Sequence, residues 1–137
     1  KEAEDVLKTV TQIDPNYADG FMRLGLLYIG QEMWVSAVEN LTTSSGLDEK
    51  DYNKFVHLAS ALNHIQKWDE AASAARTCTD LKRKFGGGWY ELGVAEMGRG
   101  NRTRAKKHFQ VAHNDRDWRE MAARKIDEIN NPAKYEK

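Results

Sequence analysis

A repeat of 34 residues constrains this chain more than any other feature of its sequence. Three segments open with an aromatic residue, reach a leucine three positions later and continue with glycine or alanine: Phe21-Met22-Arg23-Leu24-Gly25, Phe55-Val56-His57-Leu58-Ala59 and Trp89-Tyr90-Glu91-Leu92-Gly93. Alanines recur downstream with the same step, at Ala37, Ala71 and Ala105. A fixed period without insertions is typical of proteins built from stacked copies of one small unit.

Each unit is expected to be a hairpin of two helices. Apolar residues recur every three or four positions, and the strict alternation of a half-buried strand is absent. Turn residues separate the helical patterns, notably Pro15, Gly30, Gly46 and the Gly86-Gly87-Gly88 run, which we interpret as a flexible turn between repeats. We expect the small residues of the first helices to face the alanines of the second helices where the two backbones cross.

The pattern resembles the tetratricopeptide repeat (TPR) family, whose signature is W-x2-L-G-x2-Y followed by alanine and phenylalanine at fixed offsets. The matching positions are Phe21, Leu24, Gly25, Tyr28, Ala37, Phe55, Leu58, Ala59, Ala71, Trp89, Leu92, Gly93, Ala105, Phe109 and Ala112. The resemblance implies an all-α fold, a right-handed superhelix or α-solenoid of stacked antiparallel hairpins.

The repeat register divides the chain into a TPR domain over residues 1–130 and a polar tail over 131–137. The domain comprises a half repeat (1–17), full repeats at 18–51, 52–85 and 86–116, and a capping helix at 117–130, whose apolar stripe includes Trp118 and Ile126. Because Lys1 stands inside a helical pattern and is not methionine, we expect the chain to be a fragment.

Charge and composition exclude several classes of protein. The net charge is zero, which argues against a dedicated nucleic-acid binder. Residues 1–60 carry 5 basic and 10 acidic side chains, and residues 61–137 carry 16 and 11. No apolar run reaches the ~18 residues of a membrane-spanning helix. The sequence does not determine the cellular compartment. We take the cytoplasm as the default, and a missing upstream segment would also be compatible with a periplasmic or membrane-associated location.

No arrangement of residues predicts catalysis. The four histidines and Cys78 lack the spacing of a zinc site, and no nucleophile has a readable base partner. We therefore expect no enzyme activity, cofactor or metal. A basic stretch runs from Arg99 to His108, which we interpret as a solvated face, with RNA or DNA binding as a minor alternative.

The resemblance instead implies a partner-binding groove, because the first helices of such repeats line the concave side. The positions carried over are Met22, Arg23, Leu26, Ile29, Val56, His57, Ser60, Asn63, Tyr90, Glu91, Val94 and Met97. Their apolar members would form an exposed strip, a mark of protein-binding surfaces. The predicted function is a scaffold that holds a helix or extended peptide of a partner protein.

One subfamily is argued against, and one alternative remains. Family members that grip the acidic C-terminal tail of chaperones use lysine, asparagine and arginine at positions held here by Met22, Leu26, His57, Gly87 and Glu91. None of these matches, so a carboxylate clamp is not expected. The alternative is a scaffold that self-assembles into head-to-tail oligomers through the charge difference between its halves.

Overall fold

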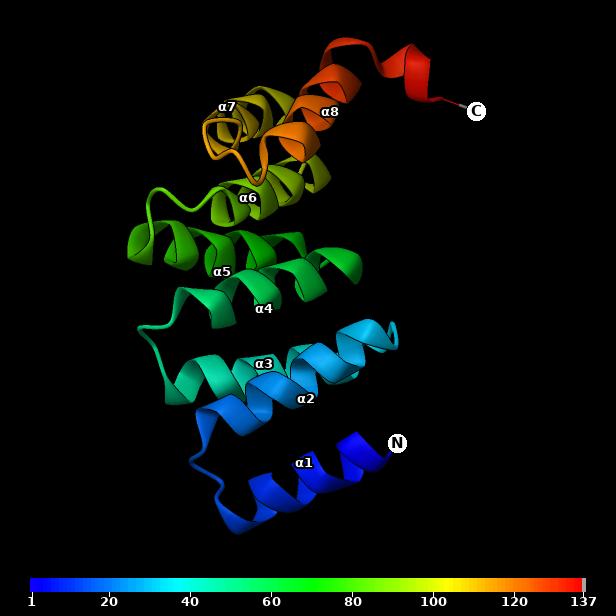
Figure 1. Cartoon of the computed structure of the whole chain (residues 1–137). Coiled ribbons are helices and arrows are strands. Elements are labelled where there is room, and N and C mark those ends of the chain that lie inside the picture. The colour runs from blue at the N-terminus through cyan, green and yellow to red at the C-terminus, as the bar shows by residue number, and fades with distance from the viewer. Residues whose placement is uncertain (137) are drawn as a thin grey trace.

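The computed structural model describes residues 1–136, which form one continuous stack of α-helices with no β-strand in this described part (Figure 1). The helices are α1 (Glu2–Ile13), α2 (Ala18–Gly30), α3 (Trp34–Leu47), α4 (Tyr52–His64), α5 (Trp68–Leu81), α6 (Gly86–Gly98), α7 (Arg102–Ala112) and α8 (Arg119–Asn130), followed by the 3-10 helix η1 (Pro132–Tyr135). The pairs α2–α3, α4–α5 and α6–α7 are the three hairpins that the repeat predicts, so the all-α solenoid is confirmed.

The same turn closes all three hairpins, with one residue in the left-handed region. Glu32, Gln66 and Gly100 have φ angles of 58°, 61° and 86°. The next backbone N–H then donates to a carbonyl five residues back: Met33 to Tyr28, Lys67 to Leu62, and Asn101 to Glu96. This is the Schellman ending of a helix. Only Gly100 adopts the conformation without the strain that a β-carbon imposes there.

A small residue lies under a large one where the two helices of a hairpin cross. A β-carbon on Gly25 would stand 2.5 Å from Leu41 Cγ, and one on Gly93 would stand 2.6 Å from the ring of Phe109. Both large side chains are fully buried. The glycines therefore lie directly against Leu41 and Phe109, one helical turn beyond the alanines that the sequence analysis expected opposite them.

The middle hairpin has a different pair of residues where its two helices cross. Its equivalent positions, one repeat along from Gly25 and Leu41, are Ala59 and Ala75, both fully buried. Two small residues thus replace one glycine and one large side chain. Because protein interiors are close-packed, the smaller second-helix residue leaves room for a β-carbon on the first helix.

The Gly86-Gly87-Gly88 run is not a flexible turn, contrary to the sequence interpretation. All three residues are buried in the first turn of α6. A β-carbon on Gly86 would stand 2.7 Å from Asp115 Cβ, and one on Gly88 would stand 2.9 Å from the sulfur of Cys78. The Gly86 N–H donates to the Asp115 carboxylate at 2.7 Å. The glycines allow α6 to pack closely against α5 and the α7–α8 loop.

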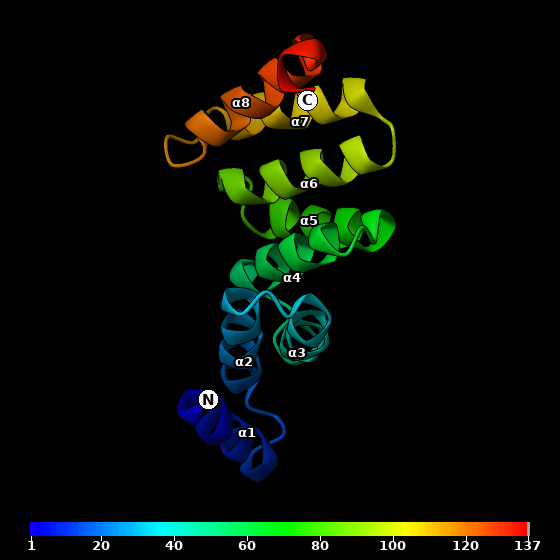
Figure 2. The same ribbon diagram turned by 90° about the vertical axis from the view of Figure 1, so that its right-hand side faces the viewer.

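The stack curves with the first helix of each hairpin on the inside. α4 contacts α6 directly, and α2 also touches α4, whereas no comparable contact joins α3 to α5 or α5 to α7 within residues 1–136. First helices are thus closer together than second helices. Successive hairpins also rotate about the stack, so that in the turned view α3 is seen end-on while α6 is seen from the side (Figure 2).

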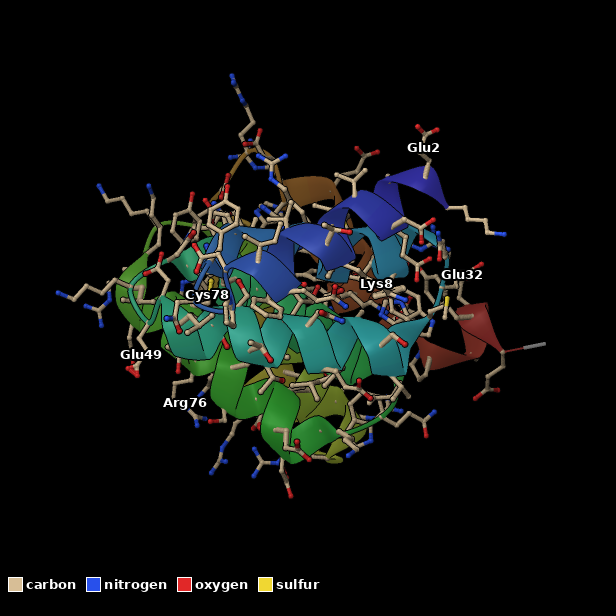
Figure 3. All side chains as sticks on the ribbon, turned by 90° about the horizontal axis from the view of Figure 1, so that it is seen from below. Glu2, Lys8, Glu32, Glu49, Arg76 and Cys78 are labelled. Atoms are coloured by element: carbon tan, nitrogen blue, oxygen red, sulfur yellow. The ribbon has the colours of Figure 1, made fainter. Side chains whose placement is uncertain are left out.

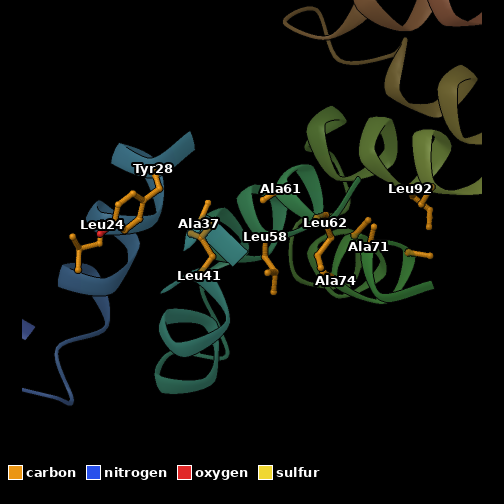
Figure 4. Packing of buried hydrophobic residues seen from close by; sticks show 14 residues of the cluster. Leu24, Tyr28, Ala37, Leu41, Leu58, Ala61, Leu62, Ala71, Ala74 and Leu92 are labelled. Atoms are coloured by element: carbon orange, nitrogen blue, oxygen red, sulfur yellow. The ribbon is translucent and has the colours of Figure 1, made fainter. Parts of the chain in front are cut away.

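The core runs along the stack as a layer made of two clusters of buried residues. Buried residues from Leu24 on α2 to Leu92 on α6 form one cluster (Figure 4). A second cluster joins Phe109 to Ala122, and Ile126 and Ile129 of α8 pack against it. α8 therefore caps the last hairpin. Among the signature residues, the aromatic residues that open each unit are half-buried and the others are buried.

Seen along the stack, charged side chains such as Glu49 and Arg76 project outward, while Cys78 lies inside (Figure 3). Burial raises the pKa of the Cys78 thiol to about 12, with the Glu91 carboxylate adding to the effect. A thiol with so high a pKa is held in its unreactive form, so Cys78 is a packing residue.

Candidate protein-binding groove

The α2 part of the expected groove is only half-buried. Met22 and Ile29 pack against the main core cluster, whereas Leu26 belongs to neither of the buried clusters found in residues 1–136. Leu26 is half-buried and Arg23 is exposed. Among the predicted groove residues of α2, Leu26 is therefore the apolar side chain that a partner can contact at least cost to the fold.

The α4 part differs from the expectation in one residue. Val56 is only 6% exposed and belongs to the core, so its predicted role as an exposed anchor is wrong. His57 and Ser60 are half-buried and Asn63 is buried. Burial lowers the pKa of His57, and the charge of Asp51 offsets part of that change. His57 is accordingly kept mostly neutral near neutral pH.

The α6 part is covered by the end of the chain. Tyr90, Val94 and Met97 are half-buried and pack against the α7–α8 cluster. The predicted strip is therefore not a continuous exposed surface, because α8 lies over its last third. The apolar stripe of residues 117–130 predicted a capping helix, but the sequence pattern did not place that helix against these groove positions.

A pocket of about 390 Å³ remains open where α4, α6 and α8 meet. It brings together five of the predicted groove residues with three others: Ser60, Asn63, Tyr90, Glu91 and Val94, joined by His64, Met121 and Lys125. The other predicted residues lie outside it: Met22, Arg23, Leu26, Ile29, Val56, His57 and Met97. Met121 and Lys125 stand one turn apart on α8, and that spacing is the signal that could have found them.

The floor of this pocket is a buried polar pair. The amide nitrogen of Asn63 donates to Glu91 Oε1 at 2.9 Å and to the Glu91 carbonyl at 3.1 Å. Burial raises the pKa of Glu91 to about 6, although the hydrogen bond from Asn63 and the charges of His64 and Lys125 oppose the rise. The carboxyl thus changes charge close to neutral pH.

The rim of the pocket is held by two further contacts. The His64 ring stacks on Trp34 with centroids 3.8 Å apart, and its Nδ1 lies 2.8 Å from the Ser60 carbonyl. Lys125 Nζ lies 3.4 Å from the carboxylate of Glu128 on the same helix. These contacts hold the two basic side chains of the rim without closing the pocket.

An ion cluster that the sequence did not reveal joins α2 to α4. The side chain of Lys54 is fully buried, with Nζ 2.8 Å from Asp19, 2.8 Å from Asp51 and 3.8 Å from Asp48. Burial by itself would lower the pKa of Lys54, but the hydrogen bonds to Asp19 and Asp51 outweigh it and raise that pKa. Lys54 therefore stays charged and ties consecutive repeats together.

The other candidate sites give less support for a binding function. The basic stretch is partly neutralised, because Arg99 pairs with Asp69 at 3.0 Å and with Glu96 at 2.9 Å, and Arg104 lies 3.7 Å from Glu96. Residues 1–136 contain no group of three or more potential metal-binding side chains. In the same part of the chain, every helix is too short or too polar to cross a membrane.

Comparison with known proteins places this geometry among solved solenoids. A crystal structure of MamA superposes with a TM-score of 0.87 at 21% identity, over 96% of this chain and 77% of that one. YrrB, described as a TPR protein with an unusual peptide-binding site, gives 0.83 at 22% identity over 90% and 64%. The first TPR domain of Spaghetti (RPAP3), bound to the HSP90 peptide SRMEEVD, gives 0.78 at 19% identity over 85% and 93%.

In sequence, the chain is 31% identical over 106 residues to Superkiller protein 3 of Schizosaccharomyces pombe. That match covers 72% of this chain but only 8% of the relative. No protein-family model matches the chain. The solved structures nonetheless establish that it has the tetratricopeptide-repeat fold, a right-handed superhelix of helical hairpins.

Proposed function

We propose that the chain is a protein-interaction scaffold, which holds a helix or an extended peptide of a partner protein on its concave face. The observation that carries this proposal is the α4–α6–α8 pocket, where five predicted groove residues meet at a cavity with polar and apolar walls. Pockets of ~300–1,000 Å³ with a few placed polar groups are typical of binding sites. Leu26 extends this face toward α2.

The solved relatives support peptide binding but not the same ligand. RPAP3 holds an acidic HSP90 peptide. This chain has Met22, Leu26, His57, Gly87 and Glu91 where chaperone-tail binders carry lysine, asparagine and arginine. The buried Glu91 carboxylate would repel an acidic tail at neutral pH. We therefore propose a partner segment that is not an acidic C-terminal tail.

Selection from a random-peptide display library tests the groove. The chain is compared with Leu26→Glu/Met121→Glu, in which both altered side chains are partly exposed and the fold is expected to persist. The control is Val35→Glu/Val111→Glu, which places the same charges at exposed positions of the second helices. We expect the selected peptides to bind the control variant as tightly as the unmodified chain. We expect them not to bind the groove variant. Equal binding to both variants would remove the proposal.

The exposed face of α1 favours a second candidate, self-assembly. α1 contains no buried residue, and Val6 and Ile13 are 57% and 79% exposed. Apolar side chains on so exposed a helix suit contact with another copy of the chain. Sedimentation velocity over rising concentration, compared with Val6→Asp/Ile13→Asp, tests it. A monomer at every concentration would eliminate this candidate.

A further inference from the structure

The α4–α6–α8 pocket presents acceptors at its floor and apolar side chains on its walls. Glu91 is 8% exposed, and its carboxylate accepts a hydrogen bond from Asn63, with the Ser60 hydroxyl as a further donor beside it. Asn63 is 6% exposed, and no donor within residues 1–136 lies within hydrogen-bonding distance of its Oδ1. Tyr90 and Val94 of α6 and Met121 of α8 supply the walls. The Glu91 carboxylate at the floor can accept further hydrogen bonds.

We propose that this pocket receives a basic side chain, arginine or lysine, from the partner peptide. The inference rests on the proposed function and specifies the chemistry of its ligand. Long basic side chains have an apolar stem, which Val94 and Met121 can cover, and a charged head, which Glu91 can accept. A guanidinium has enough donors to bind both oxygens of the Glu91 carboxylate at once.

The charged groups around Glu91 determine how the binding of a basic side chain changes with pH. The groups that face it are His64 on α4, Cys78 on α5, Tyr90 on α6 and Lys125 on α8. Lys125 is the permanent cation among them, and Glu128 offsets its charge from 3.4 Å away. Glu91 has a pKa of about 6, so it is ionised above that pH and neutral well below it. A basic peptide should therefore bind more weakly at about pH 5 than at about pH 7.5, by about tenfold.

The test begins with peptides selected from a random display library on the unmodified chain. We expect one position of the selected peptides to be enriched in arginine or lysine. Replacing that residue by citrulline or norleucine, which keep the stem and remove the charge, should weaken binding about tenfold or more. Glu91→Gln should cause the same loss, whereas Glu39→Gln, at an exposed site on α3, should cause none.

Lys125→Met separates this inference from the opposite one. If the pocket takes a basic side chain, removing the rim cation strengthens binding of the selected peptide; if it takes an acidic group, binding weakens. Peptides that bind the groove without an enriched basic residue, or that bind Glu91→Gln unchanged, would overturn the inference and leave the proposed function intact. A library that yields no groove-dependent peptide would overturn both.

Discussion

The hairpin crossings predict a specific coupling between two core residues. Gly93 lies under the ring of Phe109, whereas the middle hairpin places Ala59 and Ala75 at the same positions. The double change Gly93→Ala/Phe109→Ala converts the third crossing into the pattern of the second. If the ring of Phe109 is what requires glycine at position 93, the double variant should be more stable than its two single variants imply.

The magnitudes follow from the contacts. Phe109→Ala removes a fully buried ring and should cost about 3–5 kcal/mol. Gly93→Ala places a β-carbon 2.6 Å from that ring, and this clash should destabilise the fold by about 1–3 kcal/mol. The better helix propensity of alanine offsets about 1 kcal/mol of that loss. Without the ring the clash vanishes, so Gly93→Ala made in the Phe109→Ala background should be neutral or stabilising.

Urea denaturation followed by far-UV circular dichroism measures all four members of the cycle. We expect an interaction energy of about 1–3 kcal/mol in favour of the double variant. Ala122→Ser, a change in the same cluster away from the crossing, serves as a control that should add independently to Gly93→Ala. Additivity of Gly93→Ala and Phe109→Ala within about 0.5 kcal/mol would refute the argument that the Phe109 ring requires glycine at position 93.

Three further predictions concern stability. Gln66→Gly should raise the unfolding free energy by up to about 1 kcal/mol in chemical denaturation, because Gln66 has a φ of 61°, and Gly100→Ala should lower it by about 1 kcal/mol. Lys54→Met should cost about 1–3 kcal/mol, since it leaves three carboxylates without their shared cation; an unchanged midpoint would show that the cluster contributes nothing. The pKa of Glu91 is raised from 4.5 to about 6, so the native state binds more protons than the unfolded state between these pH values. The free energy of unfolding should therefore rise by about 2 kcal/mol in all as the pH falls from about 7 through 6, and level off below about 4.5. Glu91→Gln should remove that pH dependence.

The architecture could be predicted well from the sequence because the same pattern of small and apolar residues occurs in each of the three repeats. Most small and apolar positions recur in every unit with the same step, so the helix order and the packed faces follow from the register. The pairing across each crossing was not predictable in the same way. Which second-helix residue lies over Gly25 depends on the crossing angle, and no periodicity reports that angle.

The groove was predicted less completely, for two physical reasons. Val56 occupies a concave-side position, but it is only 6% exposed, and burial depends on tertiary contacts that the repeat pattern does not report. α8 lies over α6 and adds Met121 and Lys125 to the pocket, yet it stands outside the repeat register. The Lys54 cluster was missed because its aspartates come from α2 and from the loop before α4, which the fold alone brings together.

A map of where a selected peptide binds tests the central claim most directly. The chain, at 15.6 kDa, is small enough for a titration followed in its amide ¹H–¹⁵N spectrum. The account predicts that resonances of α4, α6 and α8 around Ser60, Glu91 and Lys125 shift, while those of the exposed faces of α3, α5 and α7 stay in place. Shifts confined to the second helices, or to α1 alone, would contradict it.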